Sequence, residues 1–495
     1  MNVINQEFIN KIRDLLQAGK THSIASLLNK GVPGNLSRQY RLPLAKAARR
    51  SGCVLLAVRV LNPLVRPSPR SAMVPSVEER AEYAACLIKM GASHEALNLL
   101  TKLDAREVAE IELYRAFALI TQWRYQEAIP LLLSYSKNPI VGPFQQMVGR
   151  VNLAAAYVNE REFENSTPLL AELAKETRKN EFHQLHGNVL EIQAQAAIFQ
   201  KDWTGGTRCL AQARKYLQSS KGLSLFFVDK WEAIQAILRN PKSESHQQGM
   251  IKIRKLAETM HHWETVRECD LYLSYSQNDE TLLKHIFFGT PFESYRKKLI
   301  RGCPFPTLPF DSYLRTNDKR KKPTYVLRLQ NGETSIPGVR LKAGQMIHRL
   351  FLSLASDFYR PLSVAYLHSQ IYPEQFFNPR SSAAKIHELV KRGRRWIEHN
   401  DAPFSIFESH SEYSLRLHSR AGILCENRSV PKSKQTFVLN KIRSSYSTES
   451  FSAKDLASLL EVSSRTARRY LKEAENQKQV ERVGNSSNTL FRLAS

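Results

Sequence analysis

The first 300 residues carry one pattern that limits the fold strongly: apolar residues recur at steps of three and four, with few alternating β-branched runs. Four segments of this region share the outline of two helices joined by a short turn. Each has a small residue in its second helix, and these residues are Ala96, Ala128, Ser166 and Gly206. They follow one another at intervals of 32, 38 and 40 residues. The pattern predicts stacked helical hairpins over residues 1–302.

In the last three segments an aromatic residue stands three positions before the small one: Tyr125, Phe163 and Trp203. The intervals lie near the tetratricopeptide period of about 34 residues, and the region resembles a degenerate tetratricopeptide-type α-solenoid. In such a solenoid a small residue lets the two helices of a pair approach, and stacked pairs bury a shared core. An irregular helical bundle is the alternative. Either fold would be an interaction or sensing scaffold, and we expect a protein or small-molecule partner on its concave face.

Basic residues exceed acidic ones throughout the chain, with 72 Lys and Arg against 46 Asp and Glu, a formal net charge of +26. Fixed cations gain free energy by displacing counterions from phosphates, so this excess favours a polyanionic partner. No apolar run approaches the roughly 20 residues that span a bilayer, and the N-terminus lacks a secretory signal pattern. The six cysteines have no C-x-x-C spacing. We therefore expect a cytoplasmic, nucleoid-associated protein with no membrane partner and reduced cysteines.

The composition changes after residue 302. Residues 303–323 contain prolines and end in a basic run, which predicts a linker. Strand patterns with turns at Asn331-Gly332 and Pro337-Gly338 follow, then two shorter helices, a long helix that begins near Asn378 or Ser381, and a hairpin. These elements predict one domain over 324–418, a second linker over 419–434, and a last domain over 435–495.

The order of a β-meander, three helices and a hairpin resembles the OmpR/PhoB-type winged-helix output domain of response regulators. In the resemblance Arg380 opens the recognition helix, Ile386 and Leu389 match core positions, and Tyr413 is the aromatic residue before the last strand. The sequence departs from the family pattern at two positions, Glu412 for the usual glycine and Val390 for the usual arginine.

On the long helix of this domain, helical periodicity predicts a core side and a polar side. The predicted core side is Ile386, Leu389, Val390, Gly393 and Ile397. The candidate DNA contacts are Arg380, His387, Lys391, Arg394 and Arg395. Glu388 and Glu398 dilute the charge of this helix, which weakens the prediction relative to the last domain.

The last sixty residues predict a second winged helix-turn-helix, similar to the DNA-binding domains of many bacterial repressors. A first helix lies in "TFVLNKIRSSY", and a second in "SAKDLASLL" with Ser452 as its N-cap. "EVS" forms the turn, in which Val462 is the apolar anchor, and a third helix starts near Ser463. Two short strands around a Gly-Asn-Ser-Ser turn complete the pattern.

In such a fold the third helix enters the major groove with its N-terminal residues near base edges. We expect Ser463, Ser464, Arg465 and Arg468 to lie at or near base edges, where arginine can pair with guanine. Arg469 and Lys472 are expected at phosphates. The wing residues Asn485, Ser486 and Ser487 are expected at the minor groove or backbone. The alternative for both domains is a protein-docking module with a solvated basic face.

The predicted linker of about 17 residues spans roughly 20–25 Å as a flexible coil, whereas one DNA turn is about 34 Å. A tether of this length stretches further, so both domains could bind neighbouring faces of one DNA and raise the apparent affinity. This geometry predicts a long binding site.

Enzymatic motifs are missing from the sequence. "QAGKTHS" ends like a phosphate-binding loop, but Asp14 stands where the first glycine belongs and helical sequence precedes it. His261 and His262 with Glu264, and His183 with His186, lack a third ligand at a known spacing. We expect no enzyme activity, no cofactor and no metal site.

Taken as one chain, the sequence predicts a mainly α protein with an N-terminal solenoid and two α+β winged-helix domains. The function implied by the resemblances is a sequence-specific, DNA-binding transcription regulator of bacterial type with double-stranded DNA as its partner. A replication or partition initiator and a non-DNA-binding adaptor are the alternatives. Whether the protein forms a homodimer, which sequence it binds and whether it activates or represses stay open.

Overall fold

The computed structural model describes residues 5–17, 20–29, 36–67, 73–218, 223–301, 310–317, 321–426, 438–439, 442–443, 445–446, 449–460, 462–483 and 489–494. Its N-terminal part is a helical array, residues 5–301, of consecutive packed helices. The first helices of the array are α1 (Gln6–Gln17), α2 (Thr21–Asn29), α3 (Arg38–Arg50), α4 (Val54–Val65), α5 (Val77–Lys89), α6 (Ser93–Leu100), α7 (Glu110–Ile120) and α8 (Tyr125–Lys137). They are followed by α9 (Pro143–Glu160), α10 (Phe163–Lys179), α11 (His183–Phe199), α12 (Trp203–Leu217), α13 (Ser224–Arg239), α14 (Glu244–Thr259), α15 (Trp263–Gln277), α16 (Glu280–Phe288) and α17 (Glu293–Arg301). The predicted mainly α fold with an N-terminal solenoid is confirmed.

The small residues predicted to allow close helix packing lie in the second helices of the pairs α5/α6, α7/α8, α9/α10 and α11/α12. Ala96, Ala128 and Ser166 have no exposed surface. At Gly206 an added Cβ would stand 2.6 Å from Gln235 Oε1 and 3.1 Å from Ile198 Cγ1. The space that Gly206 leaves is thus filled by side chains of the neighbouring helices α13 and α11.

The turns of the array share one backbone conformation. A residue with positive φ stands two positions before the aromatic residue that begins the second helix, as at Trp123 (φ 61°) before Tyr125 and Lys201 (φ 63°) before Trp203. Arg161 before Phe163 and His261 before Trp263 follow the same rule. Because non-glycine residues rarely adopt this conformation, its recurrence marks these turns as copies of one supersecondary unit.

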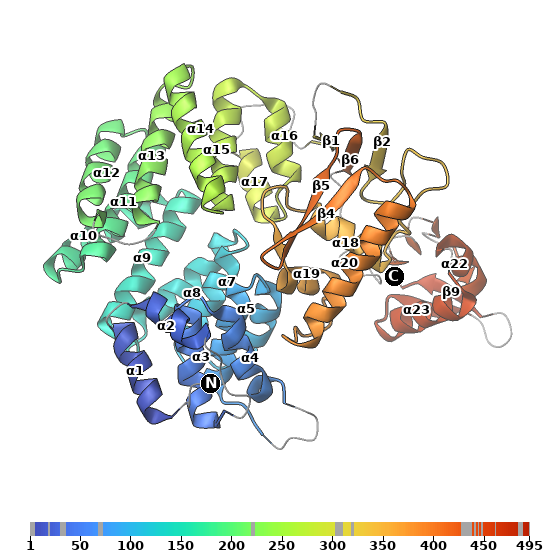
Figure 1. Ribbon diagram of the computed structural model, residues 1–495, viewed down its shortest axis with the longest axis horizontal. Coiled ribbons are helices and arrows are strands. Elements are labelled where there is room, and N and C mark those ends of the chain that lie inside the picture. Colours follow the sequence, from blue (N-terminus) through green and yellow to red (C-terminus); the bar gives the residue numbers. More distant parts are fainter. Residues whose placement is uncertain are drawn as a thin grey trace.

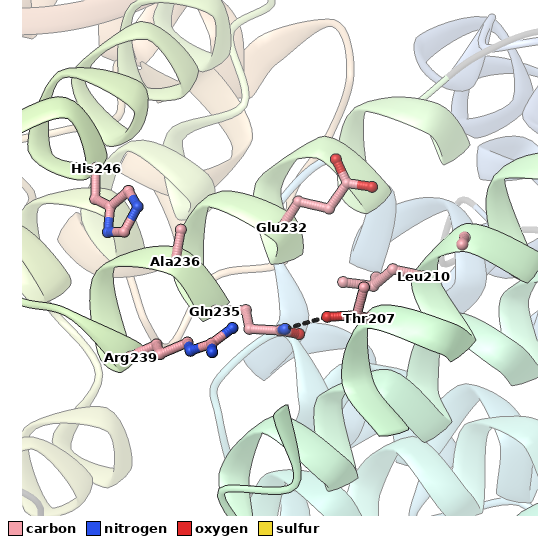
Figure 2. Close-up of a pocket in the computed structure, with 8 residues that line it drawn as sticks. Thr207, Leu210, Glu232, Gln235, Ala236, Arg239 and His246 are labelled. Carbon is pink, nitrogen blue, oxygen red and sulfur yellow. Dashed lines mark hydrogen bonds between the residues drawn. The ribbon is translucent and has the colours of Figure 1, made fainter. Parts of the chain in front are cut away.

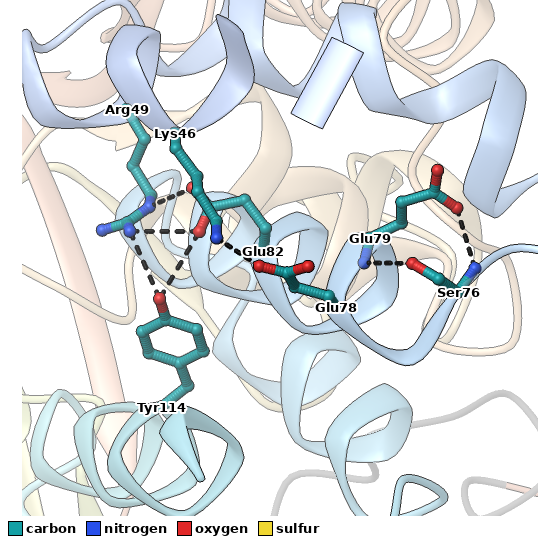
Figure 3. Close-up of polar contacts among 7 residues, drawn as sticks. All are labelled: Lys46, Arg49, Ser76, Glu78, Glu79, Glu82 and Tyr114. Atoms are coloured by element: carbon teal, nitrogen blue, oxygen red, sulfur yellow. Dashed lines mark hydrogen bonds and ion pairs between the residues drawn. The ribbon is translucent and has the colours of Figure 1, made fainter. Parts of the chain in front are cut away.

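A largely buried ion pair ties α3 to α5 (Figure 3). Arg49 of α3 donates to Glu82 of α5 at 2.6 and 3.1 Å, and the Tyr114 hydroxyl of α7 lies 3.3 Å from the same guanidinium. Helix α5 begins with a capping box in which Ser76 Oγ accepts from the Glu79 amide and Glu79 accepts from the Ser76 amide. Such reciprocal caps satisfy amides that the helix itself leaves unpaired.

The array curves into an arc, and its two ends are joined by the mixed region that follows it (Figure 1). Helix α17 lies inside this arc. Its Tyr295 packs edge-on against Trp123 at 4.5 Å between ring centroids, and its Lys298 amino group donates to the Asn159 carbonyl oxygen at the end of α9. The inner side of the array, where we expected a partner, therefore holds one of the chain's own helices.

The first α+β unit, residues 310–426, contains three helices and a hairpin in the predicted order. The helices are α18 (Met346–Leu354), α19 (Val364–Ile371) and α20 (Ser381–His399). The hairpin strands β4 (Phe404–Ser409) and β5 (Glu412–Leu417) pair antiparallel around His410 and Ser411, and the short strand β3 (Leu362–Ser363) pairs with β5. The predicted core residues of α20 are all buried: Ile386, Leu389, Val390, Gly393 and Ile397.

A second sheet of this unit lies where the sequence analysis placed linkers. Strand β6 (Ala421–Glu426) pairs antiparallel with β1 (Ser312–Thr316) and parallel with β2 (Tyr325–Arg328). The predicted linkers 303–323 and 419–434 were thus wrong over these two strands. Each is too short to show a periodicity of its own, and its partner lies about 110 residues away in the chain. Of the predicted meander, the turns with Gly332 and Gly338 at positive φ are present.

Both ends of the array are packed against the first α+β unit. At the C-terminal end Phe287 and Phe288 of α16 share a core with Phe310 and Tyr313. At the N-terminal end Phe377, from the loop before α20, is buried in the core of the first helices.

A buried ion pair also joins the array to the first α+β unit. Arg267 of α15 and Asp357 of the α18–β3 loop have no exposed side-chain surface and lie 2.9 Å apart. The array and the first α+β unit therefore form one closed body, rather than two domains on a tether.

The C-terminal α+β unit has a core drawn from residues 438–491. Of the described residues of its predicted first helix, 438–439, 442–443 and 445 are helical and 446 is not. Then follow β7 (Phe451–Ser452), α22 (Ala453–Leu460), α23 (Ser464–Asn476), β8 (Val480–Val483) and β9 (Leu490–Leu493). The sheet order is β7-β9-β8. In the part of the chain that the structure describes, no helix combines the length and the apolar character required to cross a membrane.

Candidate nucleic-acid interface

Helix α23 separates a buried side from a basic side. Ala467, Tyr470, Leu471 and Ala474 are buried. On the opposite side Arg465, Arg468, Arg469 and Lys472 are exposed, as the helical period requires. No described acidic side chain forms an ion pair with any of these four cations, and Arg469 lies 5.5 Å from the Tyr470 ring centroid. The basic face of α23 is therefore exposed to solvent.

Caps and a tight turn hold this face in place. Ser452 Oγ accepts from the Asp455 amide, and Asp455 accepts from the Ser452 amide at 2.8 Å. The bond from that amide holds the pKa of Asp455 below its ordinary value. Ser463 caps α23 by accepting from the Thr466 amide at 3.2 Å, and the Val462 side chain packs against the core. Ser463 and Ser464 are exposed at the start of the helix.

The predicted wing corresponds to the antiparallel pair β8–β9, whose register runs from Val480↔Leu493 to Val483↔Leu490. The predicted wing contacts Asn485, Ser486 and Ser487 lie outside the described residues.

Helix α20 offers a second, weaker basic face. Arg380 and Lys391 are exposed. Arg395 is exposed but pairs with Glu388 at 3.0 Å, and Arg394 donates to the Ile406 carbonyl oxygen at 3.0 and 3.2 Å. Arg394 thus anchors the helix to strand β4 of its own hairpin. This bond was not foreseen, because the helical period does not show which strand lies beside the helix.

His387 also has a structural partner. Its Nδ1 lies 2.6 Å from the Tyr413 hydroxyl of β5. Burial raises the pKa of Tyr413 to about 12, so the phenol keeps its proton at neutral pH and can donate it to His387. The pair holds the hairpin against the N-terminal half of α20.

Two exposed cations on the same helix were not among the predicted contacts. Lys385 and Arg392 are exposed, and Lys385 donates to Gln375 Oε1 at 2.9 Å. Helical periodicity alone could have included them, since they lie beside the polar side that it defines.

A pocket of about 290 Å³ lies between α12, α13 and α14 of the array (Figure 2). Leu210, Ala211 and Ala236 give it an apolar lining, and Arg239 and His246 add polar groups. Gln235 also lines the pocket and donates to Thr207 Oγ1 at 2.6 Å. Two buried atoms of the lining, Gln235 Oε1 and His246 Nδ1, have no hydrogen-bond partner. The described residues contain no cluster of three or more His, Cys, Asp or Glu that could hold a metal ion.

No protein-family model matches this chain, and no curated protein is significantly similar to it.

Proposed function

We propose that the protein is a sequence-specific DNA-binding regulator of transcription, in which both α+β units are winged helices that contact DNA. The observation that carries the proposal is the exposed basic face of α23. Its cations Arg465, Arg468, Arg469 and Lys472 are exposed on a capped helix that follows a tight turn. A helix presented in this way fits the major groove, where arginine side chains can pair with guanine.

Helix α20 would be the second DNA-contacting element, with Arg380 and Lys391 as its best candidates, because both are exposed and no described acidic side chain pairs with either. The net charge of +26 supports a polyanionic partner for the whole chain. The helical array would be the sensing part, and the pocket between α12, α13 and α14 is the candidate location for a small-molecule partner.

The test is a genome-wide footprint of the full chain beside the double variant Arg465→Ala and Arg468→Ala, followed by affinity measurements over a salt series on the sites found. We expect discrete promoter-proximal sites whose affinity falls steeply with salt. The double variant should bind at least about thirtyfold more weakly, since each base-contacting arginine contributes roughly 1–3 kcal/mol.

The matched control removes the same charge elsewhere. Arg59 and Arg208 are exposed on the helical array, so the double variant Arg59→Ala and Arg208→Ala should bind like the wild type. Equal losses of DNA affinity in both double variants would mean that the effect comes from net charge alone and not from the face of α23. Discrete sites confined to a replication origin would favour an initiator, and no DNA binding would leave the adaptor hypothesis.

A further inference from the structure

The loop before α20 is held by the N-terminal helices through its backbone. The Phe377 amide donates to Glu95 Oε2 of α6 at 2.9 Å, and the Tyr83 hydroxyl of α5 lies 3.3 Å from the Phe377 carbonyl oxygen. The Phe377 side chain is 2% exposed and belongs to the core of the first helices. These contacts join residues almost 300 positions apart in the chain.

Neighbouring residues strengthen the same contact. Arg66, the residue after α4, has its guanidinium carbon 3.6 Å from the Phe376 ring centroid and its Nη2 3.5 Å from Glu95 Oε1. Ser363, the cap of α19, donates to the Met90 carbonyl oxygen at 2.8 Å. Glu95 is 8% exposed, and a buried acceptor that satisfies a buried amide is costly to remove.

The next residue along the chain builds the first turn of α20. Asn378 Oδ1 accepts from the Arg380 amide at 2.9 Å, and the Asn378 amide donates to Ser382 Oγ. Ser382 Oγ also lies 3.0 Å from His368 Nε2 of α19. One peptide unit therefore separates the bond to Glu95 from the turn that presents Arg380.

We propose that Glu95 and Phe377 are positioning residues for DNA recognition: through them the N-terminal helices set the place of the N-terminal turn of α20. The inference rests on the proposed function, which places α20 on DNA. A change in the array that moves α6 would move the Phe377 backbone, and with it Asn378 and Arg380. Because Arg394 and Arg395 of α20 are already engaged by Ile406 and Glu388, the place in which Arg380 is held carries more of the DNA contact.

The experiment compares the full chain with Glu95→Ala, Glu95→Gln and Glu82→Ala. Glu95→Ala leaves the Phe377 amide without an acceptor, whereas Glu95→Gln keeps an oxygen at the same place. Burial raises the pKa of Glu95, and the glutamine removes only the charge that faces Arg66. Glu82 is 1% exposed and pairs with Arg49, away from the loop. Its loss breaks a buried contact between α5 and α3 and leaves the bond between Glu95 and Phe377 in place.

Two readouts are needed. Hydrogen exchange of the amides of residues 377–386, measured without DNA, should speed up about tenfold in Glu95→Ala, because one buried hydrogen bond is lost. It should return to the wild-type rate in Glu95→Gln. On DNA, the footprint of Glu95→Ala should shrink to the part protected by the C-terminal unit, and Glu82→Ala should keep the full footprint.

Unchanged exchange in Glu95→Ala would overturn the proposal, as would an equal loss of footprint in Glu82→Ala. A wild-type footprint in which the first α+β unit protects no DNA would also overturn the proposal. If the wild type bound no DNA, the proposed function would fail and the DNA role of Glu95 with it. The exchange rates would then still show whether Glu95 fixes the loop.

Discussion

Single buried polar residues hold the first α+β unit together, and His368 is the clearest case. It has no exposed surface, its Nε2 lies 3.0 Å from Ser382 Oγ, and its Nδ1 has no partner. Burial, and to a lesser extent the nearby Lys385 cation, lower the pKa of His368 to about 4. The histidine is thus neutral in the folded protein, where it links α19 to the start of α20.

Because His368 is buried and neutral, we predict that acid lowers the free energy of unfolding. Between about pH 6.5 and pH 4 the unfolded chain binds a proton at His368 that the folded chain does not. The free energy of unfolding therefore decreases as the pH is lowered through this range. At pH 5 the loss from this group is about 2 kcal/mol relative to pH 7. His368→Gln keeps a hydrogen-bonding group near Ser382 but cannot take up this proton. In urea titrations at the two pH values, its free energy of unfolding should therefore fall by about 2 kcal/mol less than that of the wild type.

The control is His418→Gln, because His418 is exposed in the same unit. This variant should lose as much stability as the wild type between pH 7 and pH 5. An identical loss in His368→Gln would contradict the assignment.

Helix pairs pack at distances set by their small residues, and two glycines test this rule with the same substitution. Gly206→Ala would place a Cβ against Gln235 Oε1, which cannot move without losing the bonds of its amide to Thr207 and Trp203. We expect a loss of about 1–3 kcal/mol in the free energy of unfolding. At Gly249 of α14 nothing lies within 4 Å of an added Cβ. Gly249→Ala should therefore stabilise by about 0.5–1 kcal/mol, and equal effects at both sites would refute the packing argument.

The helices were predictable because their signal is local. Ala96, Ala128 and Gly206 are visible by spacing, and the buried side of α23 follows from one helical period. The sheet β1-β6-β2 was not predictable, because Tyr313 and Ile423 have no signal that joins them across the chain. The loop residues Phe376 and Phe377 were missed for the same reason: two aromatic residues before a helix look like any exposed turn until Glu95 is placed beside them.

At the scale of the whole molecule, the first α+β unit joins both ends of the array, whereas the C-terminal unit has its own core. We therefore predict that residues 427–495 fold when expressed alone and that residues 1–426 keep the thermal stability of the full chain. Residues 1–309 should unfold at a markedly lower urea concentration. In this fragment Arg267 would keep Glu264 but lose Asp357, and breaking a buried ion pair costs up to about 3–5 kcal/mol.

Calorimetry of the three fragments, together with urea titrations of 1–309 and 1–426, checks this prediction. A fragment 1–309 as stable as 1–426 would mean that the contacts of Phe288, Phe377 and Arg267 contribute nothing to the array. A loss of stability in 1–426 would instead show that the C-terminal unit supports the rest of the chain.

The closure of the arc also has a mechanical consequence. An open solenoid stretches like a spring, because each repeat touches only its neighbours. Here a pull on the array must first break the Arg267–Asp357 pair and the bond between Glu95 and Phe377. An inserted hairpin would push these two contacts apart by its own width. The number of hairpins between α6 and α15 is thus tied to the span of the first α+β unit, a constraint that an open solenoid does not have.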